Sequence, residues 1–207
     1  MYKIMGFHLS IPVFIILAVF CVLSFFFSLS ETALIAINKI KARHLVNKGV
    51  KKANIVLSLI MKLDKVISAI LIGNNFVNIA FSSIITAIFV SVFKAPYAVI
   101  LSTVFATIFI LVFMEILPKT LAIKYSARSA LLTAPYLETF IKIFSPVINL
   151  FLSLINAILR ILGAEPEKRS PLISEEELKL MIEIGREEGV LSDDEKKVQY
   201  DQFGHAG

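Results

Sequence analysis

The chain has 207 residues, of which 57% are hydrophobic and 18% are charged, and its formal net charge is +5. Soluble domains hold about 45–50% apolar and about 25% charged residues, so this composition excludes an ordinary soluble domain and predicts an all-α integral membrane protein. The small positive charge gives no reason to expect nucleic acid as a partner, and the single cysteine, Cys21, excludes an internal disulfide or a cysteine-based metal site.

Three apolar segments are long enough to cross a bilayer as helices, which takes about 20 residues each. They cover about residues 8–30, 66–93 and 97–122. The second segment is interrupted by Gly73-Asn74-Asn75, where we expect a break in the helix. The third segment contains Pro118, which has no N–H to donate to the carbonyl of Met114.

The loops between these segments predict the orientation of the chain in the cell membrane. Residues 38–65 are short and strongly basic, so the positive-inside rule places them in the cytoplasm. The link at residues 94–96 is very short and suits an outside turn. We therefore expect a multi-pass protein with its N-terminus outside and its C-terminus in the cytoplasm. Residues 38–52 also predict a helix along the membrane surface that stops at Gly49.

A fourth apolar stretch, at about residues 131–162, is less regular. It carries prolines and charged side chains, among them Pro135, Pro146, Glu138 and Arg160. We favour juxtamembrane helices lying at the cytoplasmic interface, although a fourth crossing stays open. On this interpretation residues 1–163 form one transmembrane domain.

The composition changes abruptly after Gly163. Ser174 precedes three glutamates, which is typical of an N-cap followed by carboxylates in the first turn of a helix. We expect residues 164–200 to form a small cytosolic acidic helical segment and residues 201–207 to be a disordered end.

Polar side chains interrupt the apolar spans in three groups. A charged side chain inside a membrane costs about 2.5–3.5 kcal/mol by insertion scales and is a functional-site hypothesis by default. Side chains four residues apart share one face of a helix, which applies to one pair in each group. The groups are Ser24, Ser28 and Glu31; Gly73, Asn74, Asn75 and Asn78; and Glu115, Pro118 and Lys119.

The three groups together offer hydroxyl, amide, carboxylate and backbone carbonyl oxygens, without thiolate or imidazole. Such ligands suit a hard cation such as Mg²⁺, Ca²⁺ or Mn²⁺, and Na⁺ accepts the same oxygens. Plainer interpretations stay open at this point. Serine and asparagine often bond across helices, for about 0.6–2 kcal/mol each. Lys119 neutralises Glu115, holds the charge of the empty site until a cation replaces it, or lies too near the cytoplasmic edge to pair with Glu115. Glu31 lies near the cytoplasmic end of its span, where the plainer interpretation is a solvated interface residue. No nucleophile–base pair or phosphate loop is present, so we do not expect an enzyme.

Three motifs, in their order along the chain, resemble the DUF21 transmembrane domain of the CNNM/CorC family. They are Ser24–Ala36 (SFFFSLSETALIA), Gly73–Asn78 (GNNFVN) and Glu115–Lys119 (EILPK). The acidic segment Ser174–Asp194 is similar to the one that follows this domain in bacterial members. The resemblance implies three transmembrane helices, a juxtamembrane helical belt and a homodimer. It also implies a magnesium transporter, generally an exporter of Mg²⁺ driven by the entry of Na⁺.

Carried over by position, the resemblance implies metal ligands and supporting residues within the three groups. Family members usually continue into a pair of nucleotide-binding CBS domains that this sequence lacks, so we do not expect nucleotide binding in this chain. The alternative function is a membrane-anchored Mg²⁺ sensor or regulator without transport activity. Only the resemblance favours Mg²⁺ over Mn²⁺, Co²⁺ or Ca²⁺. The implied ligands are Ser24, Ser28, Asn74, Asn78 and Glu115, with Gly73, Asn75, Pro118, Lys119 and Glu31 in supporting roles.

Overall fold

The computed structural model describes residues 11–93 and 97–163. The chain divides into two compact units, residues 1–157 and residues 158–207, and only residues 158–163 of the second unit are described. Every regular element within the described ranges is a helix, which confirms the prediction of an all-α membrane protein. The predicted acidic helical segment at 164–200 and the predicted disordered end at 201–207 lie outside the described residues.

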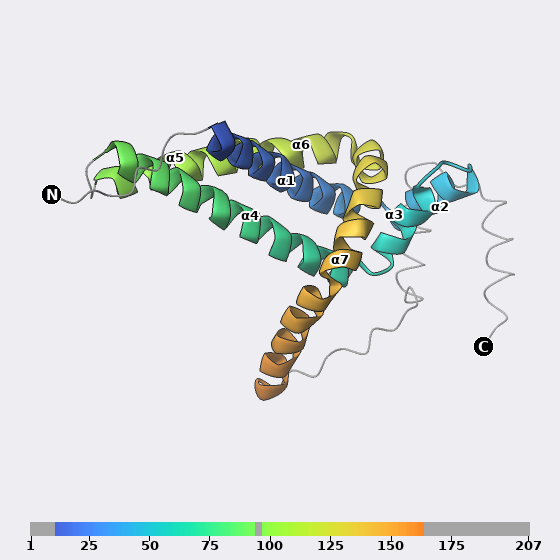
Figure 1. Cartoon of the computed structure of the whole chain (residues 1–207). Coiled ribbons are helices and arrows are strands. Elements are labelled where there is room, and N and C mark those ends of the chain that lie inside the picture. The colour runs from blue at the N-terminus through green and yellow to red at the C-terminus, as the bar shows by residue number, and fades with distance from the viewer. Residues whose placement is uncertain (1–10, 94–96, 164–207) are drawn as a thin grey trace, which may run out of the picture. The chain divides into compact units, whose positions relative to one another are not determined.

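Four helical stretches in the described part of the chain are long and apolar enough to cross a membrane. The first is α1, Ile11–Ala36, and the second is α4, Leu63–Val92. The third, Tyr97–Lys124, is made of three consecutive helical elements, and the fourth is α7, Ser126–Ile161. In Figure 1, α1 lies alongside α4 on one side and α6 on the other.

The predicted break in the second span is wrong, because α4 runs without interruption through Gly73-Asn74-Asn75. Glycine and asparagine lower helix propensity by at most about 1 kcal/mol each, and packing against neighbouring helices overrides so small a preference. A glycine is required here for a different reason. A Cβ at Gly73 would lie 2.8 Å from the ring of Phe27 and 3.0 Å from the ring of Phe140, so a larger residue would force a ring to shift.

The third stretch changes its helical geometry at its centre. It begins as α5, Tyr97–Phe109, continues as a π-helix, η1, Ile110–Ile116, and ends as α6, Leu117–Lys124. At the end of η1 the Leu117 amide donates to the carbonyl of Val112, five residues earlier. Pro118 follows directly, in the first turn of α6, and has no N–H to donate to a carbonyl one turn back. Short π-helical turns are frequent at functional sites.

The basic segment after the first span forms two short helices. Helix α2 covers Lys39–Asn47, and the side chain of Asn38 caps it by accepting a 3.0 Å hydrogen bond from the amide of Ile40. Gly49 has a φ of 69°, the left-handed conformation that commonly follows a helix end, which confirms the predicted stop. Helix α3 then covers Ala53–Ile60.

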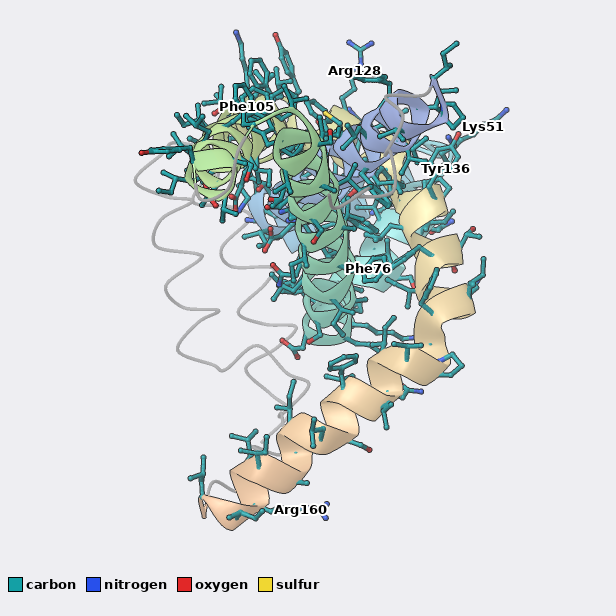
Figure 2. All side chains as sticks on the ribbon, turned by 60° about the vertical axis from the view of Figure 1, so that its left-hand side comes forward. Lys51, Phe76, Phe105, Arg128, Tyr136 and Arg160 are labelled. Carbon is teal, nitrogen blue, oxygen red and sulfur yellow. The ribbon has the colours of Figure 1, made fainter. Side chains whose placement is uncertain are left out.

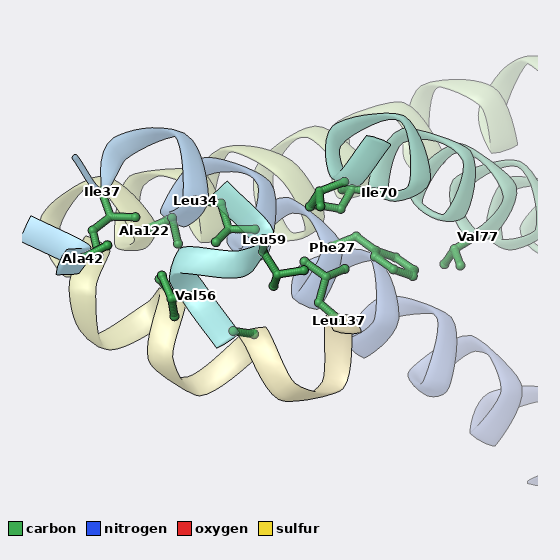
Figure 3. Packing of buried hydrophobic residues seen from close by; sticks show 14 residues of the cluster. Phe27, Leu34, Ile37, Ala42, Val56, Leu59, Ile70, Val77, Ala122 and Leu137 are labelled. Carbon is green, nitrogen blue, oxygen red and sulfur yellow. The ribbon is translucent and has the colours of Figure 1, made fainter. Parts of the chain in front are cut away.

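Two clusters of buried apolar side chains hold these elements together. The larger cluster joins α1, α2, α3, α4, α6 and α7, and Figure 3 shows Leu34, Ile70, Val56 and Leu137 within it. The smaller cluster joins α1, α4 and α5 to the π-helix through Leu17, Phe81, Ala106 and Met114. Both clusters include α1 and α4, so the other elements pack around this pair of helices.

Large apolar side chains also cover the outer surface of the helices. Phe76 on α4 is 69% exposed and Phe105 on α5 is 45% exposed, and Figure 2 labels both positions. Soluble monomers rarely expose such extended apolar surfaces, and contact with lipid explains them.

Helix α7 is one continuous helix of 36 residues that includes Pro135 and Pro146. The sequence predicted one or more interfacial helices over residues 131–162, so the helix begins earlier than expected. Its first turns are buried at Ala130, Ala134 and Leu137. Most of its later side chains are exposed.

Candidate cation site

The centre of the candidate site is a contact between α1 and α4. The Oγ atom of Ser24 lies 2.8 Å from Oδ1 of Asn74 and 2.6 Å from Oδ1 of Asn78. Ser24 is fully buried and Asn74 is 8% exposed. The two asparagines are four residues apart on α4, so both amides reach toward the same point on α1.

These three oxygens share a single proton. A serine hydroxyl has one hydrogen, so Ser24 donates to only one of the two carbonyl oxygens at a time. The other carbonyl oxygen then faces a hydroxyl oxygen at hydrogen-bonding distance without a hydrogen between them. A cation bound here would satisfy the acceptor that the hydroxyl leaves, and so would a turn of one amide that brings its NH2 group to the Ser24 oxygen.

Ser28 adds a fourth oxygen on the same face of α1. Its Oγ is buried and has no hydrogen-bond partner among the residues that the structure describes. Other hydroxyls in these helices bond to a backbone carbonyl of their own helix, as Ser30 does to Phe26 at 2.6 Å and Ser83 does to Ile79 at 2.8 Å. Buried polar atoms are nearly always paired, so an unpaired one calls for an explanation such as an ion.

The neighbouring glycine and asparagine have different positions. Gly73 is buried beside the edge-to-face pair of Phe27 and Phe140, whose ring centroids are 4.9 Å apart. Asn75 is exposed. Gly73 therefore makes room for the two aromatic rings beside the polar contact, and no hydrogen bond joins Asn75 to that contact within the described residues.

A second polar group is charged and lies between α1 and the third helical stretch. The Nζ of Lys119 on α6 lies 3.2 Å from Oε1 of Glu115 in the π-helix and 3.6 Å from Oε2 of Glu31 on α1. Glu31 is the most shielded of the three, with a side chain 16% exposed. Two carboxylates and one ammonium leave a formal charge of −1.

One face of α1 carries residues of both polar groups. Ser24, Ser28 and Glu31 follow one another at helical spacing, and seven residues of helix rise by about 10 Å. The structure thus joins Ser24, Asn74 and Asn78 by hydrogen bonds, and joins Glu115, Lys119 and Glu31 by ion pairs. Ser28 lies between the two groups on α1. Pro118 is buried beside the second group, at the first turn of α6.

The chemistry of these atoms limits which metals fit. The described residues contain no cluster of three or more histidine, cysteine, aspartate or glutamate side chains able to hold a metal ion. The available atoms are hydroxyl, amide and carboxylate oxygens, which suit hard cations.

Sequence reasoning missed two features of this arrangement. The ion pair between Lys119 and Glu31 joins helices 88 positions apart in the chain, and no spacing within one helix indicates it. The basic side chain four residues after Glu115 did indicate that these two residues can pair, and the structure contains this ion pair. The second missed feature is the unpaired hydroxyl of Ser28, because burial without a partner follows only from the packing.

Comparison with known proteins gives one family. Residues 14–195 match the family described as the cyclin M transmembrane N-terminal domain. A UPF0053 protein of Haemophilus influenzae is 35% identical over 179 residues, which are 84% of this chain and 42% of that protein. A UPF0053 inner membrane protein of Escherichia coli is 32% identical over 165 residues, which are 79% of this chain and 38% of that protein.

A third relative, a UPF0053 protein of Synechocystis, is 29% identical over 193 residues, which are 87% of this chain and 43% of that protein. The chain therefore spans less than half the length of these three curated relatives.

Proposed function

The chain belongs to the cyclin M (CNNM/CorC) transmembrane-domain family, and on that premise we propose that it carries Mg²⁺ across the membrane. The transport would be export coupled to the entry of Na⁺. The observation that supports this most is the buried contact of Ser24 with both Asn74 and Asn78, in which two carbonyl oxygens share one proton.

The ligand set explains how such a site would hold and release a divalent ion. Mg²⁺ prefers six oxygens at about 2.0–2.1 Å and gives up its water reluctantly. Neutral oxygens of Ser24, Asn74 and Asn78 replace some of that water without fixing the ion by charge. Glu115 would supply the compensating charge, and one carboxylate against a divalent ion leaves a positive remainder that favours release.

The same oxygens offer a simple basis for coupling to Na⁺. Hydroxyl and amide oxygens accept both ions, so Na⁺ entering from one side would compete with Mg²⁺ for one group of ligands. Exchange then requires that the helices present this group to either side in turn. The π-helix Ile110–Ile116 and Pro118 are the places in the third stretch where its helical geometry changes, and we assign this movement to them.

We also propose how the chain lies in the membrane. Helices α1, α4 and the stretch Tyr97–Lys124 would cross it, with the N-terminus outside and the C-terminus in the cytoplasm. The basic helix α2 and the apolar helix α3 after it would then lie at the cytoplasmic face. Helix α7 would lie at the interface, with exposed apolar side chains against lipid, and two copies would form a homodimer.

A flux measurement tests the proposal. The chain is reconstituted into liposomes that contain a Mg²⁺-sensitive dye, with and without a Na⁺ gradient. We expect the wild type to carry Mg²⁺. The flux should fall at least tenfold in Asn74→Ala and in Glu115→Gln, because losing a group that supports a metal site commonly lowers activity by that much. Ser83→Ala is the matched control, because Ser83 is an exposed residue of α4 that bonds only to its own helix.

Two outcomes would contradict the proposal in different ways. Equal flux in the wild type and in both site variants would place the ion elsewhere. No flux from the wild type under any gradient would favour the alternative of a Mg²⁺ sensor without transport activity.

A further inference from the structure

Lys119 holds an unusual position between two carboxylates from different elements. Its Nζ is 3.2 Å from Glu115, one turn earlier, and 3.6 Å from Glu31 on α1. The Lys119 and Glu115 side chains are 36% and 34% exposed, and that of Glu31 is 16% exposed. One ammonium thus serves two carboxylates that face the same space between α1 and the third helical stretch.

An ordinary ion pair four residues apart does not account for this group. Such a pair needs one acid and one base on one helix, as Lys142 and Glu138 on α7 show with a distance of 2.9 Å. Around Lys119 the second carboxylate comes from another helix and leaves the group with a negative charge. Charges within apolar spans are costly, so an excess of negative charge there is not explained by stability.

We propose that Lys119 is a tethered cation that competes with the transported cation for Glu31 and Glu115. When the site is empty, the ammonium occupies both carboxylates and limits their repulsion. When a cation enters, it takes over one or both carboxylates and the ammonium moves aside. Lys119 is then a positioning residue that weakens cation binding and speeds release. This inference rests on the proposed function and adds the means by which the site's affinity is set.

Equilibrium binding of Mg²⁺ tests this inference in the purified full chain. Calorimetric titration gives the Kd for the wild type, Lys119→Met and Lys119→Arg. Methionine keeps the length of the side chain and removes the charge, so both carboxylates lose their counter-ion. We expect the Kd of Lys119→Met to fall by about tenfold, since an opposite charge within a few ångströms has effects of this size. Lys119→Arg keeps the charge and should bind Mg²⁺ nearly as the wild type does.

Lys142→Met is the matched control. It removes the same type of side chain from an ion pair of the same spacing, on α7, and should leave the Kd unchanged. A purely structural role for Lys119 predicts the opposite sign, because a disturbed site binds the cation more weakly. The direction of the change in Kd therefore separates the two roles.

Several results would overturn the inference. If the wild type binds Mg²⁺ and Lys119→Met binds it equally or more weakly while folded, Lys119 does not compete and only this inference fails. If the wild type binds no Mg²⁺, the proposed function fails as well. If Lys119→Met does not fold, Glu31→Gln decides, because it leaves one ammonium with one carboxylate and should raise the Kd by about tenfold. An unchanged Kd in Glu31→Gln contradicts the inference.

Discussion

The hydroxyl of Ser24 on α1 lies 2.8 Å from the side-chain carbonyl of Asn74 on α4, at a point where both residues are buried. Asn78 places a second carbonyl oxygen 2.6 Å from the same hydroxyl. Hydrogen bonds between membrane helices are common, but two acceptors aimed at one donor are more than a link between helices needs. We therefore take this surplus of acceptors as the basis for proposing that a cation binds here.

Replacing Ser24 with alanine removes the one proton that the two carbonyl oxygens share. We expect the free energy of unfolding to fall by about 0.6–2 kcal/mol, the usual range for a hydrogen bond between membrane helices. Thermal unfolding followed by circular dichroism in detergent measures this change. Ser83→Ala is the control and should change little, because Ser83 is exposed and bonds only to the carbonyl of Ile79. Equal effects of the two substitutions would show that the contact of Ser24 with α4 adds no stability.

Replacing Ser28 with alanine should change the stability of the protein and its affinity for Mg²⁺ in opposite directions. The hydroxyl of Ser28 is buried without a partner in the described residues, so its removal should raise the free energy of unfolding by about 1 kcal/mol in the absence of cations. The same change should weaken Mg²⁺ binding, because a candidate ligand is lost. Ser30→Ala is the comparison, since Ser30 is also buried but bonds to the carbonyl of Phe26, and it should not stabilise the protein.

Thermal unfolding with and without Mg²⁺ measures both effects of Ser28→Ala. A variant that is less stable than the wild type without cations would show that the hydroxyl has a partner after all. If Mg²⁺ stabilises the variant as much as it stabilises the wild type, Ser28 is not a ligand of the cation.

Replacing Gly73 with alanine should force two aromatic rings apart. The new Cβ would lie 2.8 Å from a ring atom of Phe27 and 3.0 Å from one of Phe140. Overpacking of this kind costs about 1–3 kcal/mol, which the better helix propensity of alanine, about 1 kcal/mol, only partly offsets. Thermal unfolding should show a net loss, and Phe140→Leu in the same chain should recover part of it. No loss in the single variant would mean that the rings move freely.

Much of the fold follows from the sequence for simple physical reasons. The length of the apolar runs identified α1, α4 and the third stretch, because a helix must satisfy its own backbone in lipid. The spacing of four between Asn74 and Asn78 placed them on one face, and both do reach Ser24. Gly49 marked the end of the basic helix correctly.

The errors came from residues whose role depends on another helix. Gly73 and its asparagines indicated a helix break, but the glycine makes room for Phe27 and Phe140, which lie far from it in the chain. The π-helix Ile110–Ile116 was not predicted, because a helical pattern with a four-residue spacing does not indicate a change to π-helical geometry. The pairing of Lys119 with Glu31 likewise arises only when α1 and α6 pack together.

The central claim is that α1 and α4 together bind the cation, and the position of a bound ion tests it most directly. Mn²⁺ accepts the oxygen ligands of Mg²⁺ and is located in crystals by its anomalous scattering. The account predicts an anomalous peak at bonding distance, about 2.0–2.5 Å, from the side-chain oxygens of Asn74 and Asn78. The peak should disappear in Asn74→Ala and persist in Ser83→Ala. A peak away from Ser24, Asn74 and Asn78 would contradict the account, and so would a structure grown in Mn²⁺ that shows none.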